Sequence, residues 1–346
     1  MTEPVESRES KVESSIHEPG APGAASRPSP LAPRQGPAQR AWRRFRSNRL
    51  ALLGAWYLAA LVLLVVLWPL ALGVMNASGS RSAAIAAAYA PDRLSDAQFQ
   101  PPGIRHWFGT DDHGRDVFSR VVYGAHISLL VGGVGACVSL VIGVLWGAVA
   151  GYSGGRVDSI LMRVVDILYS LPSLIFVIVL LTTLGEWLKQ SHLVRESPLL
   201  ARELRVLLLL VGLGAVSWLT MARIVRGQVL SLRARPFVEA SRALGAAPLR
   251  ILWRHIIPNV LGVVIVYLTL TVPAIVLYES FLSFLGLGIQ PPMASWGSLL
   301  AEGVNQINPI RIYWWLIAIP AGVLVSTLLA INLVGNGLRD VWDVKG

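Results

Sequence analysis

Residues 237–259 read FVEASRALGAAPLRILWRHIIPN, a polar and basic stretch that separates two long apolar runs. Within it, apolar residues recur at helical spacing and form one face: Phe237, Ala240, Leu244 and Ala247. This spacing predicts a short amphipathic helix over Phe237–Gly245. A short helix between two membrane-spanning runs is suited to act as a lever against a neighbouring surface.

Both ends of this helix carry residues that favour ending one helix and starting the next. Glu239 lies in the first turn, where a carboxylate is favourable beside the helix dipole and can meet an arginine of a partner. Gly245 suits a left-handed residue at the helix end, and Pro248 suits the first turn of a following helix. Small residues at 240, 241 and 243 would let another surface approach closely.

The composition places the chain in a membrane. Of its 346 residues, 54% are hydrophobic and only 14% are charged, whereas soluble domains average about 25% charged residues. The net charge is +10, and the only lysines are Lys11, Lys189 and Lys345, so arginine carries most of the positive charge. Because the arginines lie beside apolar runs, they fit the excess of positive residues in cytoplasmic loops and argue against a nucleic-acid partner.

Six apolar runs are long enough to cross a bilayer, which takes roughly 20 helical residues. They cover residues 50–74, 127–151, 160–184, 206–222, 260–285 and 312–334. The fourth run is the shortest, and we expect Pro273 to break the fifth run early. The sequence therefore predicts an all-α integral membrane protein with six transmembrane helices.

The two ends of the chain and the loops differ in composition. Residues 1–40 are rich in Pro, Gly, Ser, Ala and Glu and predict a disordered cytoplasmic tail before a transmembrane domain at 41–346. The first apolar run begins too far along the chain for a cleavable signal peptide. Arginines concentrate at 223–259, so this loop and both termini are predicted to be cytoplasmic.

A few charged residues fall in or beside the predicted spans, where charge is costly unless it is paired. Arg163 and Asp166 are three residues apart and predict an ion pair on one helix face, with Asp158 nearby, close to a gate. Direct contact with substrate is the alternative role for these three. Glu279, in the fifth run, is either a contact for a substrate ammonium or gating partner, or a buried structural hydrogen bond.

Two of the outer loops carry distinctive residues. The segment at 106–129 predicts a glycine-rich turn leading into a short amphipathic helix, and 283–303 predicts a surface or re-entrant loop because it contains Pro291-Pro292 and several glycines. His113 and its neighbouring aspartates invite a metal site, but no second histidine has ligand spacing. A loop scaffold or docking surface is the main interpretation.

Catalytic and cofactor motifs are missing from the sequence. A P-loop needs a lysine that follows a glycine, and none of the three lysines does. The single cysteine, Cys137, rules out an intrachain disulfide framework and a cysteine-based metal cluster. We therefore expect a conduit that is not itself an enzyme and that binds no cofactor or metal of its own.

Four blocks together resemble one family of transporters. They are FGTDDHGRDVFSRVVYGAHISLLVG (108–132), GYSGGRVDSILMRVVDILYSLPSL (151–174), the stretch at 237–259 and SFLGLGIQPPMASWG (283–297). From Arg43 to Asp343 the chain resembles the second permease subunit of the dipeptide/oligopeptide/nickel group of ABC importers. Its 237–259 stretch resembles the EAA loop of these permeases, with Ser241 where alanine is usual and Ile257 where leucine is common.

The resemblance implies a type I ABC importer permease fold with a cytoplasmic EAA coupling helix, in a bacterial inner membrane. It implies a homologous second permease, two cytoplasmic ATPases that bind ATP and Mg²⁺, and an extracytoplasmic substrate-binding protein. The coupling residues would be Glu239, Ala240, Ser241, Gly245 and Pro258. Of these, Glu239, Ala240 and Gly245 would sit in a cleft of the ATPase, whose closure turns the permeases from inward- to outward-facing.

Other functions stay open at this point. Peptides are the expected substrates, and the same group also includes importers of nickel, heme precursors, glycosides and antimicrobial peptides. A stand-alone secondary transporter would show inverted repeats, and no convincing repeat is visible. An intramembrane enzyme would need paired catalytic groups at membrane depth, which the sequence does not supply.

Overall fold

The computed structural model describes residues 42–43, 45–78, 82–83, 86–87, 89–190 and 198–342. In this part of the chain the regular structure is helical, apart from one isolated bridge between Thr110 and Asp116. The tail predicted at 1–40 lies outside the described residues and stays a prediction.

Five helices in this part are long and apolar enough to cross a membrane. They are α2 (Arg49–Ala77), α4 (Val117–Ser153), α8 (Pro198–Arg233), α11 (Ile257–Phe284) and α13 (Trp315–Trp342). They correspond to the first, second, fourth, fifth and sixth predicted runs. The predicted all-α membrane fold is therefore confirmed.

The third predicted run, 160–184, is not one straight helix. It is divided into α5 (Gly155–Ser170) and α6 (Ser173–Gln190), which meet at an angle of 88°. The break falls at Leu171, which is extended (φ −81°, ψ 137°) because it precedes Pro172. If this pair counts as one broken span, the described part of the chain has six membrane crossings.

Two helix limits and one expected break also differ from the prediction. Helix α4 begins at Val117, so the short helix expected before the second run is its first part, capped by the Asp116 carboxylate, which accepts from the Ser119 N–H at 2.9 Å. Helix α8 continues to Arg233, well past residue 222. Pro273 does not break α11, because one missing backbone donor is tolerated in a membrane helix held by its neighbours.

The closest helix pair is α4 with α8. Gly143, Gly147 and Gly151 recur every fourth residue on one face of α4, and a Cβ on any of them would collide with α8. Glycine at these positions lets the two backbones approach, so the two helices form the centre of the domain.

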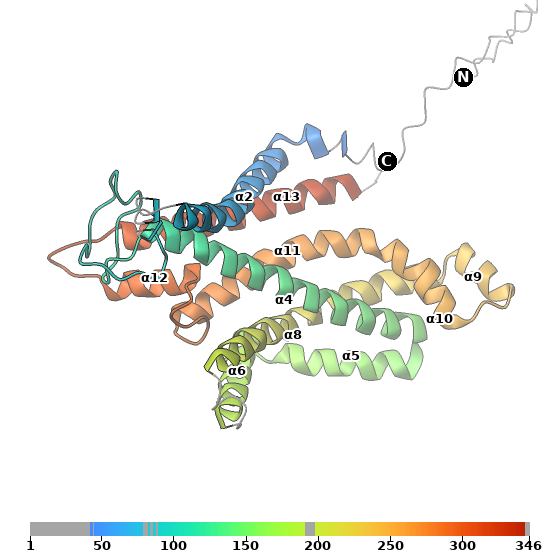
Figure 1. Cartoon of the computed structure of the whole chain (residues 1–346). Helices are drawn as coiled ribbons and strands as arrows, with labels where there is room; N and C mark the ends of the chain where they lie inside the picture. The colour runs from blue at the N-terminus through green and yellow to red at the C-terminus, as the bar shows by residue number, and fades with distance from the viewer. Residues whose placement is uncertain are drawn as a thin grey trace, which may run out of the picture. The chain divides into compact units, whose positions relative to one another are not determined.

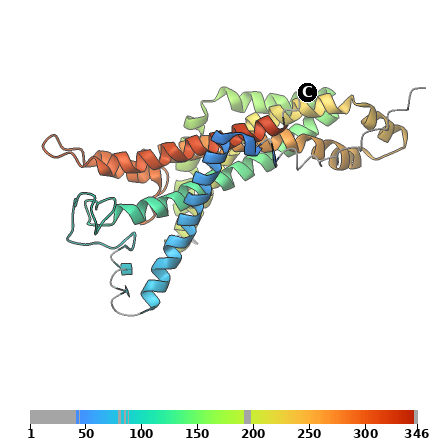
Figure 2. The same ribbon diagram turned by 90° about the horizontal axis from the view of Figure 1, so that it is seen from above.

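Helix α2 packs against the second half of α13. A Cβ on Gly54 would lie 2.8 Å from the Ala330 carbonyl oxygen, and the Tyr57 hydroxyl is 2.7 Å from the Ser326 hydroxyl. Figure 2 shows α2 crossing α13 and then diverging from it toward the first turns of α4.

The shorter helices gather at two opposite ends of the domain (Figure 1). At one end α9 (Pro236–Ala243), α10 (Pro248–Ile251) and a π-helical turn, η1 (Leu252–Ile256), connect α8 to α11. At the other end α12 (Trp296–Asn305) lies beside the start of α4. Helix α11 runs from one end to the other.

Candidate functional site

Helix α9 lies where the sequence predicts the short amphipathic helix, and one side chain anchors it. Val238 is fully buried in a cluster with Val144 of α4, Val225 of α8 and Ile251 of α10. The predicted apolar face, by contrast, points outward: Phe237 is 40% exposed and Leu244 is 87% exposed. The helix is thus fixed to the membrane helices by one side and presents its other side.

The end of α9 depends on Gly245. Its φ is +78°, in the left-handed region, and a Cβ there would meet no atom within 4 Å. The Ala246 N–H donates to the Ser241 carbonyl at 3.1 Å, and the Gly245 N–H donates to the Arg242 carbonyl at 2.9 Å. This pair of bonds is a Schellman motif, so glycine is required by backbone conformation and not by lack of space.

Four of the five predicted coupling residues lie on α9 or at its end, and the fifth, Pro258, lies on α11. Glu239 and Ala240 are exposed, and Ser241 is half-buried, with its hydroxyl donating to the Phe237 carbonyl at 2.8 Å. Pro258 stands in the first turn of α11, directly after η1. We define the coupling surface as the exposed residues Phe237, Glu239, Ala240, Leu244 and Leu249. An apolar surface of this kind with polar neighbours is typical of a protein docking site.

The acidic residues of α5 find their partners on α8 and not on α5. The Arg226 guanidinium donates to both oxygens of Asp158, at 2.5 and 2.6 Å. Arg223 donates to Asp166 at 2.8 Å and lies over the Tyr169 ring, 4.0 Å from its centroid. The predicted Arg163–Asp166 pair is therefore wrong: Arg163 is exposed, and Asp166 is taken by Arg223.

A cavity of about 590 Å³ opens at the bend between α5 and α6. Its walls come from the bend, from α8 and from α11, and they include three tyrosines, Tyr169, Tyr267 and Tyr278. Its other polar side chains are the hydroxyls of Ser173, Ser217, Thr220 and Thr271. Among the described residues that line it, none is charged, so Asp158, Arg163, Asp166 and Glu279 all lie outside its wall.

Glu279 is fully buried in α11 near the opposite end. Its carboxyl accepts from the Ser283 hydroxyl at 2.7 Å and from the Ser128 hydroxyl of α4 at 3.0 Å. Of the two interpretations that the sequence leaves open, this geometry matches the buried hydrogen bond and not a substrate contact.

An ion network at the α12 end was not foreseen. Arg120 of α4 is only 3% exposed; it donates to Glu302 of α12 at 2.5 and 3.0 Å and to Asp111 at 2.8 Å. Arg115 also donates to Asp111, at 2.7 Å. Glu302 lies far from these residues in sequence, so the pairing could not be predicted. The one sequence signal of a buried charge is Arg120 itself, which stands beside apolar residues at the start of α4.

The network also bears on the metal alternative. Oxygen and nitrogen atoms of Asp111, Asp112 and His113 lie within 4.8 Å of one another. Two guanidinium groups already occupy the Asp111 carboxylate. The cluster therefore fits the loop scaffold better than a cation site.

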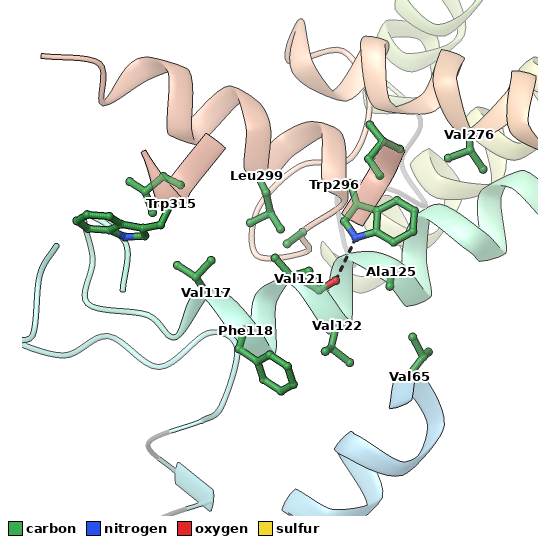
Figure 3. Packing of buried hydrophobic residues seen from close by; sticks show 13 residues of the cluster. Val65, Val117, Phe118, Val121, Val122, Ala125, Val276, Trp296, Leu299 and Trp315 are labelled. Atoms are coloured by element: carbon green, nitrogen blue, oxygen red, sulfur yellow. Dashed lines mark hydrogen bonds between the residues drawn. The ribbon is translucent and has the colours of Figure 1, made fainter. Parts of the chain in front are cut away.

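Trp296 is a second feature that the sequence reading missed. The stretch at 283–303 contains a buried helix, α12, and is not simply a surface or re-entrant loop. Trp296 is fully buried and its indole N–H donates to the Val121 carbonyl at 3.2 Å (Figure 3). Figure 3 shows the ring beside Ala125 and Val276, which fixes α12 against α4 and α11.

Comparison with known proteins places the chain in a family. The model of the family "binding-protein-dependent transport system inner membrane component" matches residues 143–344, and that of the "N-terminal TM domain of oligopeptide transport permease C" matches residues 36–102. The dipeptide transport system permease protein DppC of Bacillus subtilis is 41% identical over 307 residues, which is 89% of this chain and 85% of the relative. The oligopeptide transport system permease protein OppC of Escherichia coli K12 is 44% identical over 309 residues, 89% of this chain and 91% of the relative.

A solved structure of the MetNI methionine ABC transporter in inward-facing conformations contains a chain similar to this one. The TM-score is 0.49 at 19% identity, covering 64% of this chain and 95% of that chain. The family match rests on the sequence comparisons and not on this structure. The chain belongs to the family of inner-membrane components of binding-protein-dependent transport systems, and it is an integral membrane protein with several spans.

Proposed function

We propose that this chain is the permease subunit of an ABC importer that takes up dipeptides or oligopeptides. The names of relatives at 41% and 44% identity support peptides as substrates. The chain would form the pathway with a homologous second permease, receive substrate from an extracytoplasmic binding protein and be driven by two ATPases. ATP and Mg²⁺ would bind to those ATPases, with no cofactor on this chain.

The observation that carries the proposal is the dual character of α9. One side of it is held by Val238 in a cluster that joins α4, α8 and α11, and the other side is the exposed coupling surface. A force on this surface would therefore reach three membrane helices at once. In this proposal Glu239, Ala240, Ser241 and Gly245 seat in the ATPase, and Pro258 starts the helix that carries the movement to the opposite end.

The cavity at the bend supports a pathway for substrates of varied charge. Its lining offers tyrosine rings and hydroxyls, which can contact peptide backbone and apolar side chains without selecting a charge. Tyr169 lines the cavity and also contacts Arg223. We therefore assign the gate to two ion pairs, with Arg163 outside both. The Asp166–Arg223 pair meets the cavity at Tyr169, and the Asp158–Arg226 pair lies farther along α5.

The proposed topology follows from charge. Arg233, Arg235, Arg242, Arg250 and Arg254 lie on or beside the α9 end of the domain. Because positive residues are enriched on the cytoplasmic side, we place α9 and both termini in the cytoplasm and α12 on the outer side.

The experiment is affinity isolation of the tagged chain from its native membrane in mild detergent, followed by mass spectrometry. We expect a second permease and P-loop ATPases with the wild type. Glu239→Arg should lose the ATPases and keep its membrane level. Asp92→Arg, the same charge change at an exposed position of the outer loop, should keep them.

Two results would contradict the proposal. One is normal recovery of the ATPases with Glu239→Arg. The other is a chain that is isolated alone and transports labelled tripeptide into liposomes without ATP, which would make it a secondary transporter. Uptake of nickel or a glycoside, and not of peptide, would keep the machinery and change the substrate.

A further inference from the structure

The segment 285–295 connects α11 to α12. Serine hydroxyls hold the backbone at one position within it and at the first residue after it. The Ile289 N–H donates to the Ser283 hydroxyl at 2.9 Å. The Trp296 N–H, at the first residue of α12, donates to the Ser128 hydroxyl of α4 at 3.3 Å. Both serines are buried, so each hydroxyl that accepts from the backbone must still donate its own proton to a protein acceptor.

The two hydroxyls donate to the same side chain. Ser283 donates to Oε1 of Glu279 at 2.7 Å, and Ser128 donates to Oε2 at 3.0 Å. Ser280 adds a longer contact to Oε2, at 3.4 Å. One buried carboxyl therefore completes two separate hydrogen-bond chains, one to the middle of the connecting segment and one to its end.

Close packing around these chains leaves no room for substitutes. A Cβ on Gly288 would collide with Ser283, and a Cβ on Gly297 would collide with Ser280. A Cβ on Gly124 of α4 would lie 3.2 Å from the Ser295 carbonyl carbon. Since the backbones are this close, a lost hydroxyl cannot easily be replaced by water.

The same helix, α12, is also held farther along. Arg120, two turns before Ser128 on α4, binds Glu302 of α12 with two nitrogens. Helix α12 is thus attached to α4 near both of its ends. Among the described residues, its polar connection to α11 runs through the Glu279 chains.

We propose that Glu279 is a positioning residue of the transport cycle. Through Ser128 and Ser283 it makes α12 and its connecting segment move as one body with the outer ends of α4 and α11. This inference rests on the proposed function, because it assigns α12 to the outer face that opens and closes around substrate. Glu279 acts through the serines and does not touch substrate.

The first test is hydrogen exchange of the purified complex, followed by mass spectrometry of peptides covering 285–290 and 294–299. Ser283→Ala should raise exchange about tenfold in the first peptide only, and Ser128→Ala about tenfold in the second only, as expected for one lost buried hydrogen bond. Glu279→Leu should raise exchange in both. Ser139→Ala is the matched control, because Ser139 is a buried serine of α4 whose hydroxyl has no hydrogen-bond partner in the described chain.

The second test separates positioning from simple structural support. The complex is reconstituted in proteoliposomes, and uptake of a labelled tripeptide is divided by ATP hydrolysed at equal amounts of complex. Ser128→Ala and Ser283→Ala should lower this ratio at least about threefold while ATP hydrolysis continues. A variant with only a structural defect would instead lower peptide uptake, ATP hydrolysis and the amount of complex together.

The two tests distinguish a failure of the role of Glu279 from a failure of the proposed substrate. Unchanged exchange in the two serine variants, or an unchanged ratio of uptake to ATP hydrolysis, overturns the role of Glu279. If the wild-type complex takes up no tripeptide, the proposed substrate fails instead, and the exchange pattern still decides whether the two hydrogen-bond chains exist.

Discussion

Asp158 and Arg226 form a two-pronged ion pair between α5 and α8, with nitrogen–oxygen distances of 2.5 and 2.6 Å. The Asp158 side chain is only 13% exposed, so the pair is shielded more than most surface pairs. The neighbouring contact between these helices is the Arg223–Asp166 pair, which is more exposed. Besides an apolar contact through the buried Val165, the attachment of α5 to α8 therefore depends strongly on one guanidinium.

Replacing that guanidinium should loosen α5. We expect Arg226→Ala to lower the free energy of unfolding by about 1.5–3 kcal/mol, the range for hydrogen bonds to charged groups. Arg226→Lys should recover only part, because an ammonium cannot bind both oxygens in the same way. Thermal unfolding of the detergent-purified protein measures this. Arg163→Ala is the control and should change stability by less than about 0.5 kcal/mol; an equal loss in both variants would contradict the assignment of the pair.

Replacements of Gly245 should lower ATPase recovery in a fixed order. Its left-handed conformation costs roughly 1–2 kcal/mol for an ordinary residue, and asparagine tolerates it better than most. We expect ATPase recovery in affinity isolation to fall in the order glycine, asparagine, alanine, valine. Gly227→Ala, at an exposed glycine within α8 with open space around it, should have no harmful effect. A neutral Gly245→Val variant would show that the end of α9 is not needed.

Val238 should matter for force transmission more than for membrane insertion. Its burial is worth about 1.5–3 kcal/mol, and it is the side chain of α9 that lies in the cluster with Val144 and Ile251. We expect Val238→Ala to bind the ATPases and to transport less peptide per ATP hydrolysed. The exposed neighbour Phe237→Ala should show the reverse, with weaker ATPase binding. Equal effects in both assays for the two variants would count against a lever.

Arg120 should be the most sensitive residue of the outer network. Removing one partner of a buried ion pair costs about 3–5 kcal/mol. We expect the lower end here, because Arg115 still contacts both Asp111 and Glu302 and the Glu302 side chain is 32% exposed. We expect Arg120→Ala to lower the melting temperature strongly. The double variant Arg120→Met/Glu302→Leu should recover part of the loss by removing a carboxylate that keeps only its Arg115 contact. If the double variant is no more stable than Arg120→Ala, unpaired charge is not the cause.

The sequence predicts the spans and the short helix α9 well because both depend on local patterns. Apolar length identifies the membrane helices, and Gly245 and Pro248 act through backbone preferences that any chain shares. The prediction missed the break at Leu171 because the apolar run continues across Pro172 without a change in composition. Pro172 and Pro273 look alike in sequence, yet only the first ends a helix, since neighbouring helices decide whether a missing donor is tolerated.

Partners distant in the chain account for the remaining errors. Asp166 has Arg163 at helical spacing, but Arg223 on α8 takes it, and spacing within one helix cannot reveal that choice. Glu302 and Arg120 are 182 residues apart, and Ser128 and Glu279 are 151 apart. Such contacts follow from how whole helices pack, which one sequence does not specify residue by residue.

The separation between partners also sets an order of events during synthesis. Asp166 leaves the ribosome 57 residues before Arg223, and Asp158 leaves 68 residues before Arg226. A growing chain must therefore hold two carboxylates at the membrane boundary with their guanidinium partners still unmade. A chain that stops before Arg223 would therefore leave α5 without both of its ion pairs to α8, and we expect it to be more open to quality-control proteases.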